Sequence, residues 1–274
     1  MNEGLAGDDR RLHDIGWLKA TDGATEPLRL SSATGVEVAS SAEPAAWVRS
    51  RLLTSPRGAT LVGSAIPTGF PAYARVFHPA RLEREGEATP VRWSDVARWA
   101  GREVHSEMQW ETISQRDGPP EQPRPWTLEP STGKCPRDTL GSLIDILEMH
   151  TASRDRCYVC VWEGWAGVRT ACPNAQRVEL PGRRYILLRA PLEAVMTGVM
   201  AGPGGAHVGL GIWWPDDRAW CVATEVDFRW TYVAGSGECI AQVLSDRRLE
   251  ALPTRPEHRG DYMSDTVNGP VQPR

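Results

Sequence analysis

The sequence predicts an α+β fold: a single two-layer domain with a mostly antiparallel sheet and packed helices. Helical and strand patterns are interspersed without the strict alternation that is typical of parallel sheets. Residues 218–232 alternate between apolar and mixed positions over their whole length, which indicates a strand. The 274 residues are 41% hydrophobic and 24% charged, an ordinary composition for a globular protein.

Strand signals recur along the chain. Period-two alternation and flanking turn residues indicate strands, and a Pro-Thr-Gly-Phe-Pro turn between the first two suggests a hairpin. The predicted strands are 59–66, 72–78, 157–162, 183–189 and 218–232, the last of them long enough to need a bend.

Helix signals lie between these strands. Ser94 and Asp138 are placed to cap helices over 95–100 and 138–150, and Gly101 to end the first. Pro191 suits the first turn of a helix that runs to about residue 200. Ser236 caps the last helix, whose expected inward side chains are Cys239, Ile240, Val243 and Leu244.

Composition divides the chain into three parts. Residues 1–43 read as a mobile N-terminal arm, 44–252 as the globular domain and 253–274 as a disordered, proline-rich tail. The proline-rich stretch 117–136 is expected to form a surface loop. No internal repeat is visible.

Charge and targeting signals restrict the class of protein. A net charge of −4 and a pI near 5.9 argue against a dedicated nucleic-acid binder. The first eleven residues are charged and no apolar core follows them, while residues 190–214 are too interrupted to span a membrane. We therefore expect a cytoplasmic protein that binds neither nucleic acid nor membrane.

Six cysteines in a chain without an export signal are expected to be thiols. Cys157 and Cys160 form a CxxC motif within a predicted strand, where residues three apart point to opposite faces. The pair is therefore not expected to hold zinc, although a zinc site or a redox pair remain alternatives. We expect no cofactor.

Three segments resemble an uncharacterised family of actinobacterial proteins. They are VRWSDVARWAGREVHSEMQWETI (91–113), RCYVCVWEGWAG (156–167) and WWPDDRAWCVATEVDFRWTYVAGS (213–236). The resemblance covers most of residues 60–252 and implies that they form one unit. It implies no activity, cofactor or catalytic residue.

Glu225 and Asp227 are the best catalytic candidates. On a straight strand they share one face about 7 Å apart, above the small side chains of Ala219, Cys221 and Ala223. Two carboxylates can perform acid–base chemistry where burial separates their pKa values. Alternatively, both acids pair with arginines such as Arg218 or Arg229 and have a structural role.

A second polar cluster is Glu103, His105 and Glu107. On a strand these three side chains would share one face and could ligate a divalent metal. A solvated strand face is the alternative, and we assign no metal site.

Trp213 and Trp214 are adjacent, so at least one of them is expected to face outward beside Asp216, Asp217 and Arg218. These five residues are our candidate binding surface for an unidentified protein partner or small ligand.

The leading hypothesis is a non-enzymatic binding or interaction module, of regulatory or immunity type. The alternative is a hydrolase or transferase that uses Glu225 and Asp227, with His105 as a further candidate. A metal-dependent enzyme at Glu103, His105 and Glu107 is a third interpretation.

Overall fold

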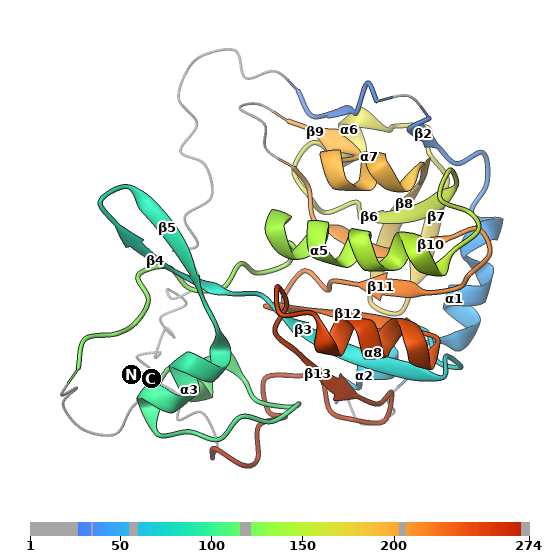
Figure 1. The fold of residues 1–274 in the computed structure, drawn as a ribbon. Helices are drawn as coiled ribbons and strands as arrows, with labels where there is room; N and C mark the ends of the chain where they lie inside the picture. The colour runs from blue at the N-terminus through green and yellow to red at the C-terminus, as the bar shows by residue number, and fades with distance from the viewer. Residues whose placement is uncertain (1–26, 34, 55–59, 116–121, 203–206, 270–274) are drawn as a thin grey trace, which may run out of the picture.

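A mostly antiparallel sheet forms the centre of the protein (Figure 1). The computed structural model describes residues 27–33, 35–54, 60–115, 122–202 and 207–269. All pairings between its described strands are antiparallel, which confirms the predicted α+β class. In spatial order the strands are β13 (Ala251–Thr254), β3 (Ala72–Phe77), β12 (Trp230–Gly235), β11 (Cys221–Ala223), β10 (Leu210–Pro215), β6 (Cys157–Trp162), β8 (Arg183–Ala190) and β2 (Glu37–Val38), with β7 (Arg177–Leu180) also paired to β8.

One side of the sheet, the aliphatic face, is covered by three of the described helices. They are α5 (Arg137–Leu147), α7 (Leu192–Thr197) and α8 (Gly237–Ser245) (Figure 1). Apolar side chains of α5 form a buried stripe that packs with Val159, Val161 and Ile186 of the sheet; they are Leu140, Leu143, Ile144 and Leu147. Ser236 caps α8 as predicted by accepting a hydrogen bond from the Cys239 amide, whereas Leu244 is partly exposed rather than inward. Shorter elements at this end of the molecule are η2 (Glu148–His150), α6 (Val168–Ala171), β1 (Arg29–Leu30) and β9 (Met200–Ala201).

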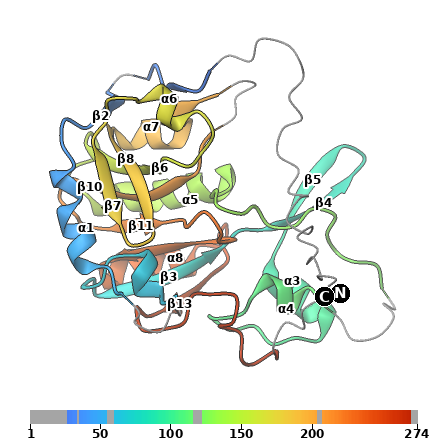
Figure 2. The same ribbon diagram turned by 180° about the vertical axis from the view of Figure 1, so that it is seen from behind.

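The other side, the aromatic face, carries further helical segments (Figure 2), and many aromatic side chains pack there. Its helical segments are η1 (Glu43–Ala45), α1 (Ala46–Arg51), α2 (Val62–Ala65), α3 (Trp93–Ala100) and α4 (Trp110–Ile113). Trp47, Trp93, Trp110, Trp214 and Trp230 all contribute to this second core. Both faces of the sheet are therefore covered.

A hairpin and α3 project away from the sheet (Figures 1 and 2). Strands β4 (Ala80–Arg84) and β5 (Glu87–Val91) are joined by Glu85 and Gly86, which both have positive φ, as in a tight two-residue turn. The helix α3 begins at Trp93, one residue before the predicted cap. The carboxylate of Glu250 accepts hydrogen bonds from the amides of Trp93 and Ser94 and so caps the helix from a distant part of the chain. Gly101 ends α3 with a φ of 70°, as predicted.

Two predicted strands are wrong. Residues 62–65 of the expected strand 59–66 form α2, because Val62 and Ile66 are buried at a spacing of four, the helical period. The expected strand 218–232 is two strands, β11 and β12, separated by a turn at 224–229. The alternation of apolar residues in the sequence continues through this turn, but the even-numbered side chains change from one face of the sheet to the other. Trp220 packs on the aliphatic face and Trp230 on the aromatic face.

The C-terminal segment differs from the expectation for 253–274. The strand β13 at the edge of the sheet extends to Thr254, and the described chain continues to residue 269 with Ser264 and Asp265 buried. Few apolar residues are needed because hydrogen bonds to residues 103–109 hold this segment. Within the described residues, no helix has the length and apolar character that a membrane span requires.

Candidate functional site

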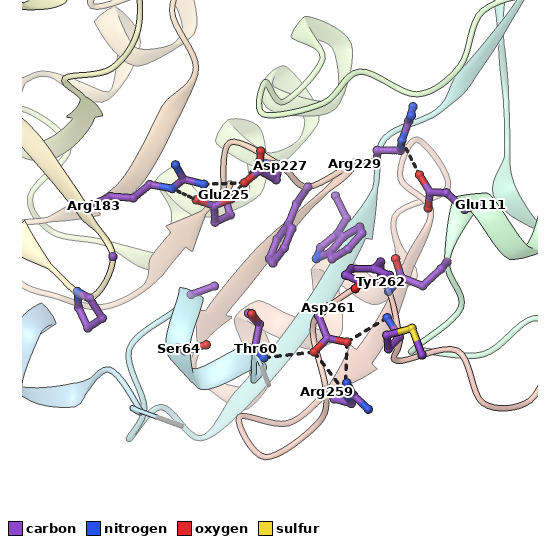
Figure 3. A pocket seen from close by; sticks show the side chains of 17 residues that line it. Thr60, Ser64, Glu111, Arg183, Glu225, Asp227, Arg229, Arg259, Asp261 and Tyr262 are labelled. Atoms are coloured by element: carbon purple, nitrogen blue, oxygen red, sulfur yellow. Dashed lines mark hydrogen bonds and ion pairs between the residues drawn. The ribbon is translucent and has the colours of Figure 1, made fainter. Parts of the chain in front are cut away.

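A groove of about 740 Å³ opens on the aromatic face (Figure 3). Its walls come from segments that are far apart in the sequence: α2, the turn between β7 and β8, the turn between β11 and β12, α4, and residues 259–263. Phe228, Trp230, Tyr262 and Met263 supply apolar surface inside it. The charged side chains that line it are Glu111, Arg183, Glu225, Asp227, Arg229, Arg259 and Asp261.

Both predicted catalytic acids lie in this groove, but on a turn rather than on a strand. Arg183 binds the two together: its Nε donates to Glu225 and its Nη2 donates to Asp227 Oδ2 at 2.6 Å. The Asp227 amide also donates to Glu225 Oε2, which fixes the turn locally. Pairing with arginine, the structural alternative, is thus observed, although the partner is neither Arg218 nor Arg229. Arg183 lies forty-two positions earlier in the chain, and only the fold brings it there.

Arg229 forms the second ionic cluster of the groove. Its Nε lies 3.2 Å from Glu111 Oε1, and its Nη2 lies 2.8 Å from Glu129 Oε2. Its Nη1 also donates to the carbonyl of Pro130. This guanidinium, like that of Arg183, is therefore shared by two carboxylates.

The third cluster belongs to the C-terminal segment. Asp261 pairs with Arg259 and accepts hydrogen bonds from the amides of Thr60 and Met263. The bond from Thr60 connects the segment to the chain two residues before α2. The groove wall therefore depends on residues that the sequence predicted to be disordered.

The expectation that Trp213 or Trp214 faces outward is wrong. Both rings are buried, Trp213 in the aliphatic core and Trp214 in the aromatic core. Alternation on β10 does send them in opposite directions, but both faces of the sheet are covered. They therefore cannot form the predicted binding surface.

The three charged residues that follow them lie in the exposed turn between β10 and β11, where each has a local partner. Asp217 accepts from the Thr151 hydroxyl and the amides of Ala152 and Ala219. Asp216 pairs with Arg156 at 3.0 Å. Arg218 has a φ of 56°, and its guanidinium lies 5.4 Å from the Trp47 ring centroid. These contacts connect the turn to its surroundings and do not extend to the groove.

Glu103, His105 and Glu107 do not share a strand face, because residues 102–107 form an irregular loop. His105 Nε2 lies 2.9 Å from Asp265 Oδ1, and Glu107 lies 3.5 Å from His258. The Glu103 backbone is bound by the side chain of Asn268. In the described part of the chain no three His, Cys, Asp or Glu side chains are grouped as a metal site requires.

Asp265, a buried acid of the C-terminal segment that contacts this loop through His105, was not singled out from the sequence. Burial favours a raised pKa, but hydrogen bonds from His105, Asn268 and Gln109 outweigh it and lower the pKa to about 2. The carboxylate is therefore ionised and holds the C-terminal segment in place. A single Asp in a proline-rich tail gives no sequence signal for such a role.

The cysteines are buried or partly buried free thiols. Cys157 and Cys160 point into opposite cores, as their spacing on β6 predicted. Burial raises the pKa of the Cys135 and Cys157 thiols to about 12 each. Such thiols are poor nucleophiles at neutral pH.

His78 forms a buried hydrogen-bonded chain that the sequence did not reveal. Its Nδ1 donates to the carbonyl of Ser131 at 2.8 Å, and its Nε2 accepts from the Thr231 hydroxyl at 2.9 Å. The Thr231 and Thr224 hydroxyls lie 2.7 Å apart. Burial lowers the pKa of His78 to about 4, so the imidazole is neutral and has a structural place in the core.

Comparison with known proteins adds no relative. Neither a family model, nor a curated protein, nor a solved structure matches the chain.

Proposed function

We propose that the protein is a non-enzymatic binding module and that its ligand site is the groove on the aromatic face. The observation that carries this proposal is the sharing of Arg183 by Glu225 and Asp227. A guanidinium that bridges two carboxylates occupies their oxygens and holds the two side chains in a fixed arrangement. The pair is thus suited to fixing the shape and charge of a surface.

The size and lining of the groove also support binding. Its volume of about 740 Å³ lies within the range of ligand pockets, and it combines apolar surface with charged side chains that ion pairs hold in place. The free thiols are consistent with a reducing compartment, which supports the cytoplasm as its location. The ligand site that we propose is therefore the groove and not the Trp213–Arg218 surface predicted from the sequence.

Photocrosslinking from two exposed methionine positions tests the proposal. A benzophenone amino acid replaces Met263 in the groove or, as the matched control, Met149 on η2. In the protein's own cells, we expect position 263 to give a discrete adduct that position 149 does not give. Thr60→Trp, which adds bulk inside the groove, should remove that adduct.

Identical adducts from both positions, or adducts that Thr60→Trp does not affect, would contradict a ligand site in the groove. The hydrolase or transferase alternative has its own readout. If the protein is such an enzyme, Glu225→Gln would abolish turnover of the compound that crosslinking identifies, while the crosslink to that compound would still form.

A further inference from the structure

Two carboxylates of the groove, Asp227 and Glu111, are more exposed than the guanidinium groups that they neutralise, whereas Glu225 is slightly less exposed than Arg183. The Asp227 side chain is 77% exposed, compared with 25% for its partner Arg183. Glu111 is 42% exposed, compared with 21% for Arg229. A ligand that approaches this part of the groove therefore meets negative charge, with the positive charge behind it.

The net charge of the ionic clusters also indicates that a ligand meets negative charge. Arg183 and Arg229 are each shared by two carboxylates, of which Glu225, Asp227 and Glu111 line the groove, so the lining side chains of these two clusters have a net charge of −1. The Arg259–Asp261 pair has the opposite arrangement, since Arg259 is the more exposed partner. The excess of negative charge therefore lies at the end formed by the turn between β11 and β12.

Apolar surface lies beside this excess. Phe228 stands in the sequence between Asp227 and Arg229, and its ring stacks on Trp230 with centroids 4.3 Å apart. Tyr262 and Met263 are exposed on the opposite wall. Lysine and arginine place their methylene stems on such surface while the charged end reaches a carboxylate.

From these observations we infer that the groove binds a segment of a partner protein that carries lysine or arginine side chains. The inference rests on the proposed function, because it names the class of ligand for the same groove. The cationic side chains contact Asp227 and Glu111, and the apolar part of the segment packs between Phe228 and Tyr262.

A phage-displayed library of random heptapeptides tests the inference, with the purified full-length protein as target. The charge variant is Asp227→Asn with Glu111→Gln, which leaves Glu225 on Arg183 and Glu129 on Arg229. The matched control is Asp95→Asn with Asp138→Asn, which removes two exposed carboxylates outside the groove. Both variants change the net charge equally.

We expect the selected peptides to be enriched in lysine and arginine. Their affinity should fall by about tenfold in the charge variant, as two surface ion pairs allow, and remain unchanged in the control. Enrichment of neutral or acidic peptides that Thr60→Trp displaces would overturn the inference and leave the groove as a binding site. Failure to select any peptide sensitive to Thr60→Trp would overturn the inference and count against the proposed function, which the crosslinking experiment tests independently.

Discussion

The two faces of the sheet differ in how completely their buried polar groups are paired. On the aliphatic face, the indole of Trp220 donates to the carbonyl of Leu147, and both nitrogens of His78 have partners. On the aromatic face, several buried polar atoms have no hydrogen-bond partner in the described structure: Nε1 of Trp47, Trp110 and Trp230, Nε and Nη2 of Arg75, Oγ1 of Thr112 and the hydroxyl of Tyr232. Trp165, beside the aliphatic core, is the exception.

Arg75 illustrates the difference most clearly. Its guanidinium is buried and lies 3.8 Å from the centroid of Trp230 and 4.8 Å from that of Phe77. Burial lowers its pKa to about 10, which leaves it charged at neutral pH. Within the described residues only its Nη1 donates a hydrogen bond, to the carbonyl of Ser106. We therefore expect the aliphatic face to provide most of the stability, whereas the face with the groove retains unpaired polar groups at a cost to stability.

The largest expected effect is on the aliphatic face. Trp213→Ala should lower the free energy of unfolding by about 3–5 kcal/mol, because the ring is fully buried and leaves a large cavity. Urea denaturation followed by circular dichroism measures this. Met149→Ala, at an exposed position, should change stability by less than about 0.5 kcal/mol. A loss below about 1 kcal/mol for Trp213→Ala would mean that this face is not the main stabilising core.

The second-largest expected effect is the change in stability with pH that His78 causes. His78 has a folded pKa of about 4, below its ordinary value of 6.5, so between these values the unfolded chain binds a proton that the folded protein does not. Its contribution to stability is present above pH 6.5 and is lost as the pH falls towards 4, by about 3 kcal/mol. His78→Gln should remove this part of the pH dependence. Urea denaturation at pH 7 and pH 4.5 checks it, and equal losses in the two proteins would show that His78 is not buried as a neutral group.

The smallest effect is expected on the aromatic face. Arg75→Met replaces a buried charge by an apolar side chain of similar length, and should change the free energy of unfolding by about 1 kcal/mol or less in either direction. The lost ring contacts and the unpaired Ser106 carbonyl oppose the gain from removing a desolvated cation. The same denaturation experiment applies. A loss above about 3 kcal/mol would show that Arg75 stabilises its face as strongly as Trp213 stabilises the other.

Elements whose signals are local could be predicted. The helix of residues 137–147 could be predicted from the spacing of its apolar residues. The Ser236 cap and the helix end at Gly101 depend only on residues next to them in the sequence. The turn at 224–229 could not be predicted, because the alternation of side chains continues through it. Glu225 and Asp227 were therefore identified as a pair, but in the wrong local structure and with the wrong arginine partners.

The sequence by itself determined the α+β class, the strands around Tyr73, Val159 and Ile186, and the opposite orientation of Cys157 and Cys160. These depend on periods of two and 3.6 residues, which short stretches express on their own. Tertiary structure alone decided that both faces of the sheet are covered, that Trp213 and Trp214 are both buried, and that Arg183 meets Glu225. The reason is physical: burial and ion pairing depend on which distant segments come together, and residues 183 and 225 meet only after β8 and the β11–β12 hairpin are in place.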